Sequence, residues 1–478
     1  MISKRPAAVL ACLFALAGCV APGRDAAVRI KPASTYAAAS LTTPVAAAWP
    51  NAEWWRAYGD PQLDRLIATA LQDSPDVAAA AARVNRAEAL VRTARAAQQP
   101  GVIANATGGL TKQSYNNGFP AQFVPHGYKQ FGRASLDFSY EIDFWGKNRA
   151  GTAAARSDAA AAAADRAAAV VMLSTSIAAE YAQLTQFDAD RDVALASVQL
   201  RANTLKLVND RVVGGLDTRA ESQAAAANVP AARGDLAAID ESIVLARNAL
   251  AALTGAGPDA GLAITSPPAN FTRRAFGLPP TLAAELIGHK PEIVAARLRA
   301  EAAAARIHQA RAQFYPNVNL IAFVGLQSLG LGNLVKAGSD IGQVAPAFSL
   351  PLFDGGRLKA NLRGTEADYA LAVATYDSTV VKALQDVADA AASARALTGQ
   401  LEQARAALAF EEDAYRVARL RYTGGLANYQ SVLLVENDVL LRRRAFTDLS
   451  ARAFALDVAL IKALGGGYVA AGPALAVN

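Results

Sequence analysis

The sequence predicts a chain that is mainly α with a membrane β-barrel, and three observations predict this fold class. The chain repeats itself, so that each half reads helix, two strands, long helix, glycine turn and helix. The two longest helical segments are rich in alanine and contain no proline. The strand segments alternate polar and apolar side chains, which is typical of strands with lipid on one side and water on the other.

The N-terminus has the features of a lipoprotein leader. Lys4 and Arg5 form a positive segment, residues 9–17 are apolar, and Leu16-Ala17-Gly18-Cys19 follows. This tetrapeptide resembles the lipobox of bacterial lipoproteins, which implies removal of residues 1–18 and covalent diacylglycerol and palmitate on Cys19. Val20 stands where an aspartate would favour retention at the inner membrane, so the resemblance implies the outer membrane. An ordinary signal peptide with an incidental cysteine is the alternative.

Composition argues against several other classes of protein. The 478 residues are 53% apolar and 18% charged, and the net charge of +6 is spread without a basic block, so a nucleic-acid partner is not expected. Removal of Cys12 with the leader leaves one cysteine, so no disulfide is expected. The only histidines, His126, His289 and His308, are scattered, and no nucleophile, zinc or Walker pattern occurs. We therefore expect no enzyme activity, no metal and no cofactor other than the lipid.

The repeat sets the expected domain boundaries. Residues 19–60 form an extended N-terminal segment, residues 61–270 the first repeat, residues 271–468 the second, and residues 469–478 a tail. Matching segments of the two repeats are Pro75-Asp76-Val77 and Pro291-Glu292-Ile293, Gly109 and Gly325, Phe138-Ser139 and Phe348-Ser349, and Arg211–Leu216 and Arg421–Leu426.

The longest helices are expected over residues 148–213 and 359–422. At the rise of an α-helix each would be about 100 Å long. Helices of this length are normally coiled coils, and alanine seams let their backbones pack closely. A solvated alanine tract is the alternative, but apolar residues recur at heptad-like spacing, as Leu401, Leu408 and Tyr415 do. The shorter helices that follow the glycine turns are expected to end at about residues 256 and 464.

Strands are expected at about residues 101–115, 130–145, 317–328 and 340–353. In the second, Leu136, Phe138 and Tyr140 alternate with polar residues, as lipid-facing and water-facing positions do. The water-facing candidates for the barrel lumen are Asp137, Glu141 and Asp143. A half-buried strand of a soluble sheet would look similar, and residues 318–335 are apolar enough for a rival transmembrane helix. Because four strands cannot close a barrel and open edges are not tolerated in lipid, the chain is expected to share its barrel with copies of itself.

Further motifs resemble those of the TolC-like outer membrane factors, in particular their NodT-type lipoprotein subgroup. These motifs are Trp54-Trp55, Gly59-Asp60-Pro61-Gln62-Leu63-Asp64, Asp143-Phe144-Trp145-Gly146-Lys147 and Pro351-Leu352-Phe353-Asp354-Gly355-Gly356-Arg357. The resemblance implies a homotrimer with a twelve-strand barrel and a hollow periplasmic coiled coil. It implies the exit duct of an efflux pump, with a periplasmic adaptor and an inner-membrane transporter, first of the resistance-nodulation-division type, as partners. The alternatives are a type I secretion duct and a coiled-coil lipoprotein that bridges envelope layers without a pore.

Two glycine turns are the candidates for the periplasmic tip and gate of that duct. Paired glycines suit tight turns because they reach positive φ without penalty. The candidate residues are Arg211, Gly214, Gly215, Leu216, Glu221, Arg421, Tyr422, Gly424, Gly425, Leu426 and Tyr429. The resemblance implies a ring of three Glu221 carboxylates, whereas Asp217 is expected to assist a helix N-terminus. Ala427, Asn428, Ser431 and Leu434 replace the charged residues of the family's second turn, so closure is expected to depend on Tyr422, Tyr429 and packing.

Overall fold

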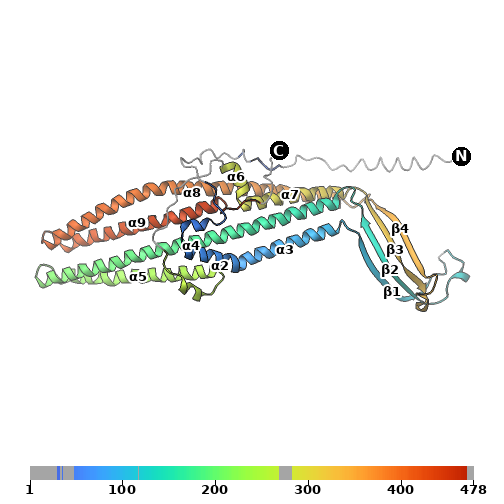
Figure 1. Ribbon diagram of the computed structural model, residues 1–478, viewed down its shortest axis with the longest axis horizontal. Helices are drawn as coiled ribbons and strands as arrows, with labels where there is room; N and C mark the ends of the chain where they lie inside the picture. Colours follow the sequence, from blue (N-terminus) through green and yellow to red (C-terminus); the bar gives the residue numbers. More distant parts are fainter. Residues whose placement is uncertain (1–28, 33–34, 36–47, 117, 268–281, 471–478) are drawn as a thin grey trace. The chain divides into compact units, whose positions relative to one another are not determined.

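The structure is a computed structural model, and it describes residues 29–32, 35, 48–116, 118–267 and 282–470. In these residues the predicted fold class is confirmed, because long helices accompany one small antiparallel sheet (Figure 1). The chain divides into two compact units that each take residues from both repeats. Of the described residues, unit 1 contains those within Met1–Ile30, Val84–Ala162 and Ala296–Tyr376, and unit 2 those within Lys31–Arg83, Ala163–Ala295 and Asp377–Asn478. Cys19, the predicted lipidation site, lies outside the described residues.

The order of elements repeats as the sequence predicts. The first set is the short helix η4 (Trp54–Tyr58), α2 (Pro61–Asp73), α3 (Pro75–Ala96), β1 (Gly101–Thr111), β2 (Lys129–Glu141), α4 (Lys147–Val213) and α5 (Arg219–Leu253). The second set is α6 (Leu282–His289), α7 (Pro291–Ala312), β3 (Asn317–Leu329), β4 (Asp340–Ser349), α8 (Arg357–Thr423) and α9 (Tyr429–Ala463). Short 3₁₀ turns lie at Ala121–Phe123, Pro258–Ala263 and Leu331–Asn333.

Proline marks the start of several helices because its missing N–H is not needed in the first turn. Pro61, Pro75 and Pro291 are the first residues of α2, α3 and α7. Asp60 caps α2, and its carboxylate accepts a hydrogen bond from the backbone N–H of Gln62 at 2.7 Å. The entry motif that contains Asp60 and Pro61 therefore begins a helix, as the resemblance implied.

Unit 1 contains the sheet, whose four antiparallel strands lie in the order β1-β2-β3-β4 (Figure 1). Ser135 of β2 is opposite Asn105 of β1 on one side and Gly325 of β3 on the other. The strands end earlier than expected, at Thr111, Glu141 and Ser349 rather than near residues 115, 145 and 353. Since β3 occupies residues 317–329, the rival transmembrane helix over residues 318–335 is rejected.

Unit 2 contains the main apolar core. Side chains from η4, α2, α4, α5 and α9 meet there: Trp54, Trp55, Tyr58, Leu63, Ile67, Ile177, Tyr181, Leu184, Ile243, Leu250, Phe454, Val458 and Ile461. The buried phenol of Tyr181 donates a hydrogen bond to the Asp60 carboxylate at 2.5 Å. The same carboxylate therefore caps α2 and holds it against α4.

Candidate functional site

The two glycine turns close two helical hairpins, one of α4 and α5 and one of α8 and α9 (Figure 1). In the first turn the Leu216 N–H donates to the Arg211 carbonyl at 2.8 Å, and in the second Leu426 and Arg421 repeat this bond at 2.8 Å. Each turn is a Schellman motif, which satisfies carbonyls at the end of a helix. Only the second glycine of each pair has positive φ, at +70° for Gly215 and +74° for Gly425. Gly214 and Gly424 do not use this freedom.

A cluster of three polar side chains joins the first turn to α8. The Arg211 guanidinium pairs with Asp217, with 3.0 Å between Nε and Oδ2, and its Nη1 donates to the Tyr422 carbonyl at 2.7 Å. The guanidinium carbon lies 4.3 Å from the centre of the Tyr422 ring. The Tyr422 phenol donates a hydrogen bond to the Asp217 carboxylate. We call these three residues the turn cluster.

The turn cluster is shielded from water. The side chains of Arg211 and Asp217 are 11% and 5% exposed, and Tyr422 is fully buried. The hydrogen bond to Asp217 raises the pKa of Arg211, whereas burial is the largest cause that raises the pKa of the Tyr422 phenol. The arginine therefore stays charged and the tyrosine stays a hydrogen-bond donor. An ion pair with this little exposure is costly to break, since the remaining charge would be left without a partner.

An apolar cluster next to these residues joins all four helices of the two hairpins. It consists of Val208, Ala225, Tyr422, Tyr429 and Val432. Tyr429 is 3% exposed, and its phenol accepts a hydrogen bond from Asn228 of α5 at 3.4 Å. Tyr422 and Tyr429 therefore pack between the two hairpins, beside the ion pair of Arg211 and Asp217. Their expected role in closure stays a prediction.

The N-terminus of α5 corrects one expectation about Asp217. Thr218 is the N-cap, and its hydroxyl accepts from the Glu221 N–H at 3.4 Å. The Glu221 carboxylate in turn accepts from the Thr218 N–H at 2.7 Å, which completes a capping box. Asp217, expected to assist this helix, instead binds Arg211 and Tyr422. The Glu221 ring stays a prediction, and in one chain Glu221 has a capping role.

The remaining tip candidates are at the surface. Leu216 and Leu426 are 68% and 73% exposed, and Val213 beside them is 90% exposed. Arg421 is exposed and forms no ion pair with another described residue. The two turns therefore differ. Ala427 of the second turn stands at the position of Asp217 in the first, so Arg421 lacks the carboxylate partner that Arg211 has.

Glu436 is a site residue that the sequence analysis did not identify. It lies on α9 at 1% exposure and accepts a hydrogen bond from the Thr204 hydroxyl of α4 at 2.7 Å. Burial raises its pKa, an effect that Thr204, Arg201 and Tyr415 partly offset. The signal was available, because Glu436 continues the buried stripe of Tyr429 and Val432 at helical spacing. An acid in such a stripe indicates a buried polar contact.

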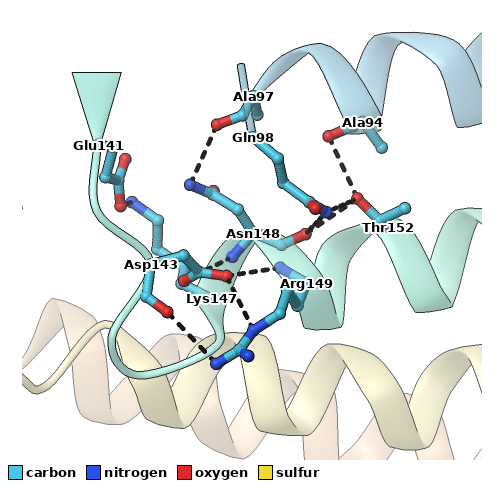
Figure 2. A network of polar contacts seen from close by, with 9 residues as sticks. All are labelled: Ala94, Ala97, Gln98, Glu141, Asp143, Lys147, Asn148, Arg149 and Thr152. Carbon is cyan, nitrogen blue, oxygen red and sulfur yellow. Dashed lines mark hydrogen bonds and ion pairs between the residues drawn. The ribbon is translucent and has the colours of Figure 1, made fainter. Parts of the chain in front are cut away.

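The passage from β2 to α4 forms a second polar site, in unit 1 (Figure 2). Asp143 lies beyond the end of β2, and its carboxylate accepts from the N–H groups of Asn148 at 3.2 Å and Arg149 at 2.8 Å. The assignment of Asp143 to the barrel lumen stays a prediction, and in one chain its side chain caps α4. Asp354 caps α8 in the same way and accepts from the Leu358 N–H at 2.9 Å.

The other two lumen candidates lie on β2. Asp137 accepts hydrogen bonds from Asn105 at 2.6 Å and Ser135 at 2.9 Å. Glu141 pairs with Lys147 at 2.5 Å (Figure 2). Their place in a barrel lumen stays a prediction. In the described part of the chain no three His, Cys, Asp or Glu side chains meet as a metal site would require.

The sequence is similar to proteins of known family. The sequence model of the family described as outer membrane efflux protein matches residues 66–256 and 282–466. The multidrug resistance outer membrane protein MdtP of Escherichia coli O6:H1 is 31% identical, over 98% of this chain and 99% of that protein. The fusaric acid resistance protein FusA of Burkholderia cepacia is 35% identical, over 75% of this chain and 69% of that protein.

Solved structures share the fold. The outer membrane protein VceC of Vibrio cholerae is 43% identical with a TM-score of 0.83, over 88% of this chain and all of that chain. The MtrE outer membrane channel of Neisseria gonorrhoeae, solved in its open state, is 26% identical with a TM-score of 0.77, over 93% of this chain and 98% of that chain.

Proposed function

The chain belongs to the outer membrane efflux protein family, and on this premise we propose that it is the outer-membrane exit channel of a multidrug efflux pump. The observation that carries the proposal is the four-stranded sheet, whose edge strands β1 and β4 have no further neighbour in the described residues. Open strand edges are not tolerated in lipid, so the sheet requires partners. Three copies would supply a closed barrel of twelve strands.

The hairpin turns are the proposed inner entrance of the channel. Opening an entrance requires the hairpin of α8 and α9 to move against that of α4 and α5. The turn cluster joins these hairpins within one chain, because Arg211 and Asp217 belong to the first and Tyr422 to the second. We assign the cluster the role of holding the closed arrangement, with the Glu221 ring as a selectivity element.

The partners we propose are an adaptor and a transporter. Val213, Leu216 and Leu426 expose apolar side chains around the turns, which suits a helical periplasmic adaptor. A resistance-nodulation-division transporter is our first choice for the inner membrane, and a type I secretion system the second. The channel would act on its cargo by conduction alone, without catalysis. Lipid on Cys19 would add an anchor to the barrel. A coiled-coil lipoprotein without a pore is disfavoured because it has no use for the sheet.

Single-channel recording in planar lipid bilayers tests this proposal. The purified protein is expected to conduct ions with a preference for cations, because three Glu221 carboxylates would converge on one axis. Glu221→Lys should reduce or reverse that preference, whereas Glu241→Lys, a charge reversal further along α5, should not. A protein that inserts into the bilayer without conducting would contradict the channel. Selectivity that Glu221→Lys leaves unchanged would contradict the carboxylate ring.

A further inference from the structure

Exposed apolar side chains lie at both places where a strand is followed by a long helix. Phe144 and Trp145 precede α4, and Leu352 and Phe353 precede α8. All four are exposed, from 52% at Trp145 to 92% at Phe353. Three exposed cations follow them in the first helical turns: Arg149, Arg357 and Lys359. We call these four apolar and three basic residues, all of unit 1, the junction surface.

Helix stability does not explain these cations. The positive end of a helix dipole favours acids and disfavours bases in the first turn, yet the first turns of α4 and α8 contain no acid. The capping role belongs to Asp143 and Asp354, whose carboxylates accept from the backbone. The basic side chains are therefore unfavourable for the helices that carry them, and an interaction outside the chain would account for Arg357 and Lys359.

The three cations of the junction surface are available to bind an anion from outside the chain. Arg357 and Lys359 form no ion pair within the described residues. Arg149 contacts Asp143 with 3.5 Å between Nε and Oδ2 and donates from Nη2 to the Asp143 carbonyl at 3.3 Å, but its side chain remains 67% exposed. A second copy of the chain is a poor partner, because in a symmetric assembly it presents the same cations at the same level.

Trp145 fixes the apolar part of the junction surface. Its indole Nε1 donates to the Pro316 carbonyl at 2.9 Å, and its ring stacks on Tyr315 at 4.6 Å and 18°. Tyr315 and Pro316 lie between α7 and β3. Trp145 of the first repeat is therefore held against the second repeat. Tryptophan and tyrosine prefer the level of lipid headgroups, where one end of the ring is apolar and the other hydrated.

We propose that the junction surface binds the phosphate groups of anionic phospholipids in the inner leaflet of the outer membrane. The inference rests on the proposed function, in which the strands span the membrane and the long helices extend into the periplasm. The four apolar side chains contact the upper acyl chains, and the three cations lie one helical turn further on, at the level of the phosphates. Basic residues that follow a membrane segment attract anionic lipid in this way.

Native mass spectrometry of the full-length protein tests the inference. The protein is reconstituted into phosphatidylethanolamine vesicles that contain a minority of phosphatidylglycerol, and the lipids retained on the released protein are counted. We expect phosphatidylglycerol to be enriched over its share of the vesicle. The triple variant Arg149→Gln, Arg357→Gln and Lys359→Gln should lower that enrichment by at least about fivefold. A factor of this size corresponds to losing the attraction of one basic residue for anionic lipid.

Two further proteins make the result specific. The control Lys206→Gln, Arg233→Gln and Arg452→Gln removes the same charge from exposed positions of α4, α5 and α9 and should retain the enrichment. The variant Arg149→Lys and Arg357→Lys keeps the charge and should retain it too. Equal enrichment in the wild type and the glutamine triple variant would overturn the inference, as would an equal loss in the control. The proposed channel is judged separately, by the conductance of the wild type in the same lipid.

Discussion

The phenol of Tyr422, at the end of α8, donates a hydrogen bond to the carboxylate of Asp217, in the turn between α4 and α5. This bond connects the two hairpins at their turns, and the Arg211 guanidinium lies against both residues. The second repeat cannot form the equivalent contact, because Val212 and Ala427 stand at the corresponding positions. One repeat therefore supplies the ion pair and the other supplies the tyrosine.

Tyr422→Phe is expected to open the proposed entrance more often. The variant keeps the buried ring but removes the hydrogen bond to a charged group, which is worth about 1.5–3 kcal/mol. The open probability should rise roughly tenfold or more, since about 1.4 kcal/mol is a factor of ten. Single-channel recording measures it. Tyr369→Phe, on the same helix and without a hydrogen bond to a described residue, should not change it. Equal open probabilities in the two variants would contradict the proposal that the hydrogen bond between Asp217 and Tyr422 holds the entrance closed.

The stability of unit 2 is expected to depend on pH through Asp190. Burial and the neighbouring Asp448 raise the pKa of Asp190 from 3.8 to about 6, and Arg444 partly offsets this. The folded chain therefore binds this proton more tightly than the unfolded chain, so stability falls as pH rises from 3.8 to about 6. Asp190→Asn should remove this part of the dependence in thermal unfolding, whereas Asp192→Asn, at an exposed position, should not. If Asp190→Asn kept the full wild-type dependence of stability on pH, the assignment of this dependence to Asp190 would be wrong.

The two glycines of the second turn should respond differently to alanine. Gly425 has φ +74°, a conformation that costs a residue with a Cβ about 1 kcal/mol. Gly424 lacks positive φ, and its added Cβ would lie 3.4 Å from the Leu420 carbonyl oxygen, an ordinary contact. Gly425→Ala should therefore lower the midpoint of thermal unfolding, while Gly424→Ala leaves it unchanged or raises it. A lower midpoint in the Gly424 variant alone would contradict the geometry of the turn.

Gly325 is expected to be essential for pairing β2 with β3. A Cβ at this position would overlap the Ala134 carbonyl oxygen and lie 2.7 Å from the Cα of Ser135, both on the neighbouring strand. Gly325→Ala should therefore prevent β2 from pairing with β3 and abolish the proposed trimer, which size-exclusion chromatography in detergent measures. Gly364→Ala, on an exposed part of α8 with no atom near the added Cβ, is the control and should preserve it. Normal assembly of the Gly325 variant would contradict the strand register.

Cys19→Ser tests the proposed anchor without changing the sheet. Serine cannot accept the thioether lipid, so metabolic labelling with palmitate should be lost, while the protein remains in the outer-membrane fraction because the barrel still holds it. Cys12→Ser, within the leader, should label normally. Palmitate labelling that persists in Cys19→Ser would reject the lipobox interpretation.

The sequence predicted the elements well where local chemistry controls them. Proline marks the start of three helices, and glycine marks the turns that end α4 and α8, so the order of elements followed from the repeat. Alternation alone could not find the end of β2. The pattern continues to Phe144, but β2 ends at Glu141 because a turn at Phe144 and Trp145, followed by Gly146 with φ +76°, leads the chain into α4.

The turn cluster shows what the sequence could not reveal. Asp217 and Tyr422 lie in different hairpins, and although the resemblance places both turns at one tip, nothing local to either residue indicates that their side chains meet. Their contact depends on the packing of α4, α5, α8 and α9 around Val208 and Tyr429. Glu436 is different, because its place in an apolar helical stripe was visible in the sequence.

Electron microscopy of the detergent-purified protein tests the central claim most directly, because it reports symmetry, length and hollowness together. A channel built from these chains predicts a three-fold symmetric hollow particle with a barrel of twelve strands and a helical part about 100 Å long, as the helical rise requires. A thin monomeric rod without a central hole would contradict the channel and favour a lipoprotein that bridges the layers of the envelope.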